Sequence, residues 1–448
     1  MVINFSHQHT GNRNILAVAI YFLSGIFVTM PIISVNIGGA PVSVFSILFV
    51  FFYVTTLWLA LEDKKDFKIN SLSSALVIWY LLSLIASAMG VIYFGADSLW
   101  LDQLLSYVPK ILLYLTLLLC MMKWNVQNYI MTAFIKGFLY GCIANLIWSI
   151  IEGLYYYAFD APLNDLLFLD YVTTLPENRP YMTVVADGII RASGFNFDPA
   201  HLGAIIPIVV VYSLFSGNFY LFALALASLI FSGSTTALVA SVLAVIISLG
   251  KLKLHKSEVK NVGIFLTTVV VILVGLAAND QVRESLYKNA QGFYERTNDN
   301  YVDNADQGPR FIYNAYLPEA IFYSGFRVLT GSGFGTASYP YVANPEINTI
   351  LVEENRPYDP ESTYISYLFD TGLFGLLFYL FVLINAIIIY RRRLNLSSTE
   401  LIIYSSLCGM FFSGFFYHYT LTAYQILILT FAVVAKDWGQ APKKKDVT

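Results

Sequence analysis

Long apolar stretches without alternating polar positions set the limits on the fold of this chain. Each runs for about 17 to 25 residues, the length that an α-helix needs to cross the hydrocarbon core of a bilayer. Because the stretches lack alternation, they are helices rather than the strands of a membrane barrel. Of the 448 residues, 57% are hydrophobic and 12% are charged, which excludes an ordinary soluble protein. The sequence therefore predicts an all-α, polytopic protein that forms a single integral membrane domain over residues 1–448.

Hydropathy in windows of about 19 residues gives about twelve candidate transmembrane helices. They lie near residues 15–33, 41–61, 72–94, 104–122, 127–151, 199–215, 219–232, 235–249, 261–278, 372–390, 401–418 and 420–435. The seventh and eighth are short and are joined by the small-residue turn Ser232, Gly233 and Ser234. The first lacks a strongly basic leading segment and a small-residue cleavage site, so we expect a retained helix rather than a cleaved signal.

Basic residues occur in alternate loops and so orient the chain. With twelve spans, the basic loops 62–68, 251–260 and 391–393 share one side with the lysine-rich tail. The positive-inside rule assigns that side, and both termini, to the cytoplasm. Two large hydrophilic segments, 159–198 and 279–371, are then predicted to lie on the outer face.

The second outer segment has a composition that favours ordered structure. Its aromatic stretch FIYNAYLPEAIFYSGF, residues 311–326, is predicted to form an amphipathic helix along the membrane interface. The turn GSGFG, residues 331–335, lacks the register of a dinucleotide loop and follows no strand of a βαβ unit. We therefore expect short helices in this segment, no nucleotide site, and chemistry on the outer face.

Neither a metal, a cofactor nor a nucleic acid is indicated. The acidic stretch NDNYVDNAD, residues 298–306, breaks the ligand spacing of an EF-hand and lacks its terminal Glu. The formal net charge of -3 gives no argument for a nucleic-acid partner. The cysteines fall inside apolar stretches, where a thiol behaves as a small hydrophobic group. They are Cys120, Cys142 and Cys408.

Two arginines on the outer face are candidate ligand-binding residues. Arg191 opens the stretch RASGFNFDPAHLG before the sixth predicted span, and Arg310 precedes the aromatic stretch of the second outer segment. Each could snorkel to lipid phosphates, but outward-facing arginines are disfavoured as topological anchors. Guanidinium groups match phosphate oxygens in bidentate geometry. We therefore predict that Arg191 and Arg310 bind an outer-leaflet ligand that carries phosphate.

Polar residues at expected helix starts leave two interpretations open. Asp198 and Pro199 are typical of an N-cap and a first helical residue, so we expect them to start a helix. His201, one turn into that helix, could be a base or a hydrogen-bonded helix residue. Glu361, after Pro360, could cap a helix or act as a general base. His201 and Glu361 are therefore the candidate catalytic residues.

Four motifs occur in an order that points to a known family. They are R-x-x-G-x-x-x-D-P at 191–199, Arg310, the turn at 331–335, and ESTYISYLFDTGLFG at 361–375. In this order the chain resembles the O-antigen polymerases and O-antigen ligases over residues 191–380. The resemblance implies a metal-independent, inverting glycosyltransferase that uses an undecaprenyl-diphosphate-linked sugar chain. The reaction would take place on the periplasmic side of the bacterial inner membrane.

The resemblance also implies roles for individual residues. Arg191 and Arg310 correspond to the arginines that bind the diphosphate. Glu361 stands at the position of the base, where many members, notably ligases, carry His. In FSGSTTAL, residues 231–238, relatives often have Ser-Arg after the Gly, and this chain has Ser234 and Thr235.

The expected function is polymerisation of a surface polysaccharide such as O-antigen, since polymerases are the more variable group and the base position lacks His. The partners expected are undecaprenyl-diphosphate-linked oligosaccharides and membrane lipids, with a chain-length regulator as a candidate. One alternative is a ligase that transfers glycan to lipid A-core. Another is a transporter or flippase, which should show internal repeats and ionisable residues near the midplane. Lys110, Lys136 and Glu152 fall toward span ends, where snorkelling explains them.

Overall fold

A computed structural model gives the fold for most of the membrane-spanning part. The residues that it describes are 12–37, 40–62, 69–94, 99–124, 128–168, 184–186, 189–196, 199–249, 263, 267, 316–343, 362–393, 396–417 and 422–435. Arg310, Glu361 and most of the predicted span 261–278 lie outside these residues, as does the acidic stretch 298–306.

Five of the described helices are long and apolar enough to cross a membrane. They are α2 (Val44–Glu62), α3 (Ser71–Phe94), α4 (Leu99–Trp124), α5 (Asn128–Phe159) and α17 (Thr363–Arg392). Shorter helices complete the bundle: α1 (Asn12–Phe27), α7 (Pro199–Ser216), α8 (Phe219–Ser232), α9 (Thr235–Leu249), α18 (Ser398–Ser413) and α19 (Ala423–Val434). The prediction of an all-α, multi-pass membrane protein is confirmed, whereas the number of twelve spans stays a prediction.

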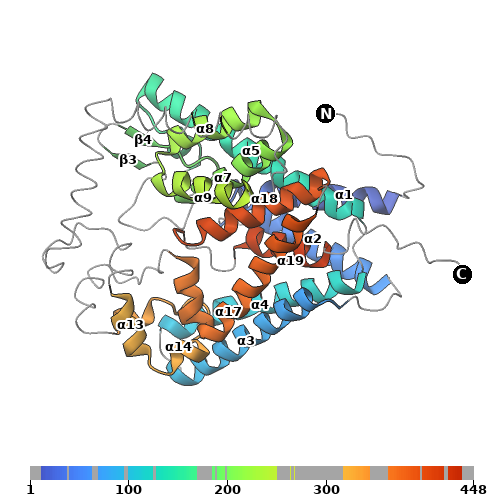
Figure 1. The fold of residues 1–448 in the computed structure, drawn as a ribbon, viewed down its shortest axis with the longest axis vertical. Helices are drawn as coiled ribbons and strands as arrows, with labels where there is room; N and C mark the ends of the chain where they lie inside the picture. Colours follow the sequence, from blue (N-terminus) through green and yellow to red (C-terminus); the bar gives the residue numbers. More distant parts are fainter. Residues whose placement is uncertain are drawn as a thin grey trace, which may run out of the picture.

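Two hairpins and several short helices connect the longer helices. Two antiparallel hairpins are formed by β1 (Ser34–Ile37) with β2 (Ala40–Ser43) and by β3 (Val184–Ala186) with β4 (Ile189–Arg191). The described part of 279–371 contains α13 (Leu317–Ser324), α14 (Arg327–Thr330) and α15 (Tyr339–Val342), and α6 (Leu163–Phe168) follows α5. Figure 1 shows β3, β4 and α13 on the same side of the molecule, at the left.

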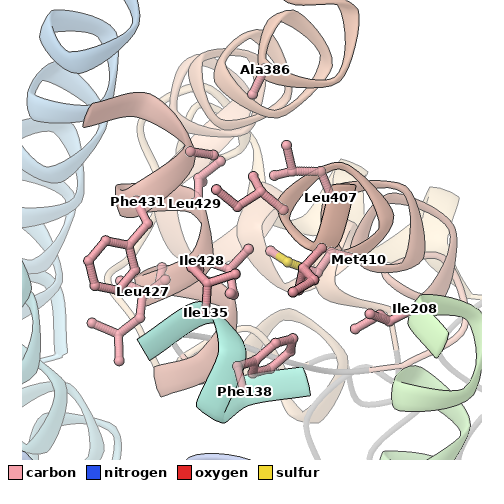
Figure 2. Packing of buried hydrophobic residues seen from close by; sticks show 14 of the residues in the cluster. Ile135, Phe138, Ile208, Ala386, Leu407, Met410, Leu427, Ile428, Leu429 and Phe431 are labelled. Atoms are coloured by element: carbon pink, nitrogen blue, oxygen red, sulfur yellow. The ribbon is translucent and has the colours of Figure 1, made fainter. Parts of the chain in front are cut away.

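One part of the apolar core lies where α18 and α19 meet α5 and α7. Figure 2 shows side chains of α18 and α19 packed against Ile135 and Phe138 of α5 and Ile208 of α7. Phe138, Ile208 and Leu407 are fully buried. This packing fixes α18 and α19 between two parts of the bundle that are distant in sequence, so the ends of these helices have defined neighbours.

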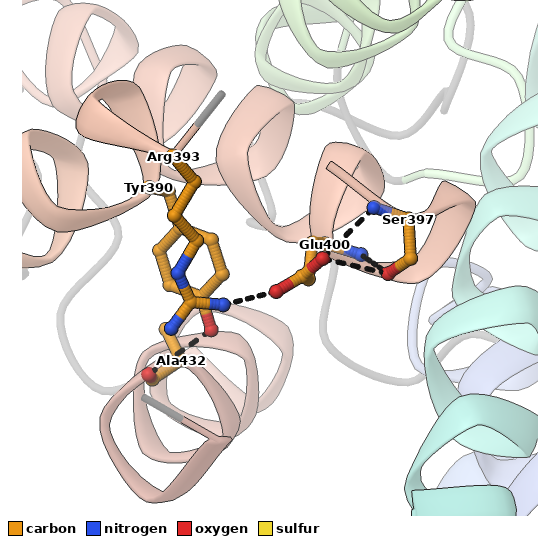
Figure 3. Close-up of polar contacts among 5 residues, drawn as sticks. All are labelled: Tyr390, Arg393, Ser397, Glu400 and Ala432. Atoms are coloured by element: carbon orange, nitrogen blue, oxygen red, sulfur yellow. Dashed lines mark hydrogen bonds and ion pairs between the residues drawn. The ribbon is translucent and has the colours of Figure 1, made fainter. Parts of the chain in front are cut away.

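One end of the bundle, which we call the Arg393 rim, is tied together by polar contacts. Arg393 forms an ion pair with Glu400, whose carboxylate also accepts from the backbone N–H of Ser397 at 2.8 Å in a capping box (Figure 3). The Tyr390 hydroxyl donates to the Ala432 carbonyl at 3.2 Å. The end of α17, the start of α18 and the end of α19 therefore meet at this rim.

Helix α17 is broken at Gly372, which has φ 74° and ψ 173°. The break leaves the carbonyls of Phe369 and Asp370 open, and they accept from the N–H groups of Ser332 at 3.0 Å and Gly333 at 2.8 Å. The buried GSGFG turn therefore packs against α17 at this break. The predicted span began at 372, whereas the helix begins nine residues earlier, at Thr363. The part after the break is about 20 residues, or about 30 Å, long enough to cross the bilayer by itself.

Candidate functional site

Arg191 lies against the turn that joins α8 to α9. The backbone N–H of Ala192 donates to the Phe231 carbonyl at 2.9 Å, which fixes the end of β4 beside the end of α8. The half-buried Arg191 side chain passes over Gly233, because a Cβ built on that glycine would lie 3.6 Å from Arg191 Cγ and 4.0 Å from Nε. Gly233 has φ 55° and closes α8 as its C-cap. The motif arginine is therefore placed by the small-residue turn 232–234.

A buried carboxylate holds the backbone of the same motif. Glu152 of α5 is 0% exposed, and its Oε2 accepts from the N–H groups of Ser193 and Gly194, each at 3.0 Å. The interpretation of Glu152 as a snorkelling residue is therefore wrong, because a snorkelling side chain reaches water and this one is enclosed. No local signal in the sequence links position 152 to 193, so sequence reasoning missed this role.

Two buried asparagines extend that support along the turn 193–196. Asn145 Oδ1 accepts from the N–H of Phe195 at 2.9 Å. Asn164 Nδ2 donates to the Gly194 carbonyl at 2.9 Å. Since buried amides and carboxylates must keep their hydrogen bonds, this network favours one conformation of the turn. The backbone that carries Arg191 is consequently rigid on its C-terminal side.

Tyr417 brings three further segments together. Its hydroxyl is hydrogen-bonded to Ser234 Oγ at 2.7 Å and to Thr236 Oγ1, next to the glycine that Arg191 covers. Its ring end fits against Gly203 of α7, where a Cβ would lie 2.4 Å from the hydroxyl oxygen. Tyr417 is 3% exposed. Gly203 of α7, the first turn of α9 and the turn after α18 therefore meet next to the glycine that Arg191 covers.

The start of α17 joins the same region through backbone contacts. The N–H and the Oγ1 of Thr363 donate to the Tyr417 carbonyl, at 3.0 Å and 2.7 Å. Ser362 Oγ donates to the Gly414 carbonyl at 3.2 Å. Glu361 directly precedes Ser362 in the chain. We call this end of the bundle, with Arg191, Ser234, Tyr417 and Thr363, the Arg191 rim.

The remaining predicted site residues have different outcomes. His201 is half-buried in the first turn of α7, two residues before the glycine that contacts Tyr417. Helix α7 begins at Pro199, as the capping pattern predicts. Arg310 and Glu361 lie outside the described residues, so their placement stays a prediction. Within the described ranges, no group of three or more His, Cys, Asp or Glu side chains is arranged to hold a metal ion.

The electrostatics of the Arg191 rim favour an anion. Helices α7, α9 and α17 all begin there, and the N-terminus of a helix carries a partial positive charge. The N–H groups of Thr363 in α17 and of Ala237 in α9 already donate within the protein, to the Tyr417 carbonyl and to Ser234 Oγ, so the helices contribute mainly through their dipoles. Arg191 adds a full positive charge at the same rim. An anionic group with several oxygen acceptors, such as a phosphate or diphosphate, matches this arrangement.

Comparison with known proteins adds one finding. Residues 220–380 match the family model described as O-Antigen ligase, a region that contains α8, α9, the GSGFG turn and the first part of α17. Arg191 and Tyr417 lie on either side of the matched region. No curated protein matches the chain at a significant level of similarity.

Proposed function

Because residues 220–380 match the family model described as O-Antigen ligase, we propose that the chain is a polysaccharide polymerase of the bacterial inner membrane. It would join undecaprenyl-diphosphate-linked repeat units at the periplasmic face as an inverting glycosyltransferase. The observation that carries the proposal is the meeting of Arg191 with the N-termini of three helices at one rim. A lipid diphosphate is the substrate group that such a rim accommodates.

The orientation of the chain supports a reaction outside the cytoplasm. Arg391, Arg392 and Arg393 lie at the rim opposite Arg191, and the positive-inside rule places such a basic cluster in the cytoplasm. The Arg191 rim then faces the periplasm, with both chain termini on the cytoplasmic side. Lipid-linked repeat units would approach the rim from the outer leaflet.

The proposed reaction is a single displacement at the anomeric carbon of the donor glycan. A hydroxyl of the acceptor repeat unit attacks that carbon, and the bond to the diphosphate oxygen breaks with inversion. Arg191 and Arg310 stabilise the negative charge that the leaving diphosphate acquires. Glu361 takes the proton of the attacking hydroxyl, for which it must be ionised and within hydrogen-bond reach. His201, in the adjacent first turn of α7, is the second candidate for that role.

A ligase is the second candidate, because the matching family model is described as O-Antigen ligase. Both functions share the donor, the diphosphate-binding arginines and the geometry of displacement, and they differ in the acceptor. Glu361 in place of the histidine of many ligases favours the polymerase. A chain-length regulator would be a further partner of a polymerase.

Glycan display in a strain that lacks the gene tests the proposal. The strain is complemented with wild type, Arg191→Ala, Arg310→Ala or a control, Arg392→Ala at the opposite rim, at matched membrane levels. A polymerase predicts core capped by one repeat unit in the deletion strain, and a ladder that wild type and Arg392→Ala restore and the other two variants do not. Accumulated lipid-linked polymer with bare core would instead identify a ligase, and repeat units retained on the cytoplasmic face would identify a flippase.

A further inference from the structure

Tyr417 occupies a position between the two parts of the proposed active site. One part is the α8–α9 turn, over which the Arg191 side chain lies. The other part is the start of α17, where Thr363 follows two residues after Glu361. Tyr417 contacts the first with its hydroxyl and the second with its backbone carbonyl. A single residue therefore joins elements that are separated by more than a hundred positions in the chain.

The backbone around Tyr417 is itself well fixed. The N–H of Tyr417 donates to the Ser413 carbonyl at 2.9 Å, and the N–H of Gly414 donates to the Met410 carbonyl at 3.0 Å, so the turn continues the end of α18. Helix α18 packs in the apolar core, where Met410 is 2% exposed. The turn is thus anchored by the core and holds both of its partners against a rigid support.

The hydroxyl of Tyr417 links two hydrogen-bonding partners in a buried position. The hydroxyl oxygen both packs against Gly203 and is placed to bond Ser234 Oγ and Thr236 Oγ1. A buried hydroxyl that keeps its hydrogen bonds fixes the separation of the groups it joins. Ser234 belongs to the turn over which the Arg191 side chain lies, and Thr236 belongs to the first turn of α9.

We propose that Tyr417 is a positioning residue that sets the distance between Arg191, the proposed diphosphate ligand, and Thr363 at the start of α17, two positions after the proposed base in the chain. This inference rests on the proposed glycosyltransferase function. Tyr417 acts through Ser234 and Thr236 on one side and through Thr363 on the other, and it touches no reacting atom. Catalysis depends steeply on such alignment, since a displacement of about 1 Å can cost about 100-fold in rate.

The test is Tyr417→Phe, which removes one oxygen atom and keeps the ring and the backbone carbonyl. The full-length protein is reconstituted in lipid nanodiscs and supplied with lipid-linked repeat units extracted from the deletion strain. We expect kcat to fall by about 10- to 100-fold, while KM for the lipid-linked donor and the shape of the pH–rate profile stay those of wild type. The melting temperature of the variant should stay within a few degrees of the wild-type value.

Two further variants distinguish positioning from a general effect on folding. Tyr390→Phe removes an equally buried tyrosine hydroxyl at the Arg393 rim and should leave kcat unchanged. The effects of Ser234→Ala and Tyr417→Phe on kcat should be less than additive, because both changes break the Tyr417–Ser234 hydrogen bond, while Ser234→Ala alone also removes the acceptor of the Ala237 N–H. Wild-type kcat in Tyr417→Phe, or full additivity in the double variant, overturns the inference. If wild type itself transfers no glycan, the proposed function fails first, and the two failures are thereby distinguished.

Discussion

The carboxylate of Glu152 should be one of the strongest single supports of the Arg191 rim. Replacing it with alanine leaves the N–H groups of Ser193 and Gly194 without their acceptor in an enclosed site. Each unsatisfied buried donor costs about 1 to 3 kcal/mol, so Glu152→Ala should lower the free energy of unfolding by about 2 to 6 kcal/mol. Glu152→Gln keeps an amide oxygen that can accept from both groups, and its loss should be clearly smaller.

Thermal unfolding of the purified protein, followed by its tryptophan fluorescence, measures this ranking. Glu319→Ala, which removes an exposed carboxylate of α13, is the control and should unfold like wild type. Among the variants that remain folded, KM for the lipid-linked donor should rise most in Glu152→Ala, less in Glu152→Gln and not at all in Glu319→Ala. The reason is that the turn after Arg191 becomes less rigid in that order. Equal melting temperatures for Glu152→Ala and wild type would refute the reasoning, because a carboxylate without effect cannot be holding the turn.

Further predictions concern the contact between the GSGFG turn and α17, and the Arg393 rim. Gly372→Ala places a Cβ 2.3 Å from a backbone carbonyl oxygen at a positive φ and should lower the free energy of unfolding by about 2 to 4 kcal/mol. Gly325→Ala, also at a positive φ but with open space around it, should lower it by about 1 kcal/mol in the same thermal assay. Asp370→Ala removes the side-chain acceptor of the Thr336 N–H and should cost about 1 to 3 kcal/mol, while Asp370→Asn, which keeps an acceptor oxygen, should cost less. Glu400→Ala breaks both a capping box and an ion pair and should lower stability by about 1 to 2 kcal/mol without changing KM, as measured by unfolding and turnover together.

The apolar helices were predictable because their signal is local. A run of apolar residues as long as α2 or α3 has few other solutions in a bilayer, and the pair at 198 and 199 predicts the start of α7 from capping chemistry alone. The start of α17 was harder to predict, because the stretch Thr363–Thr371 mixes polar and apolar residues. A hydropathy window therefore detects only the part after Gly372.

The connections of the site could not be predicted, because they pair positions far apart in the chain. Tyr417 and Ser234 are 183 positions apart, and Glu152 and Ser193 are 41 apart. Each of these residues has an ordinary sequence context, and its role depends on which helix ends meet in space. The motif arginine could be selected from its chemistry, but the groups that hold it could not.

The shortness of α8 and α9 has a consequence for the lipid-linked substrate that we propose. With 14 and 15 residues they measure about 21 and 22 Å, against a hydrocarbon layer of about 30 Å. The bilayer beside such short helices becomes thinner, so phosphate groups of the outer leaflet lie closer to the turn that Arg191 covers. A long isoprenoid can then present its diphosphate to the protein while its tail stays in the bilayer. Membranes built from longer acyl chains would oppose that local thinning and should slow the proposed transfer reaction.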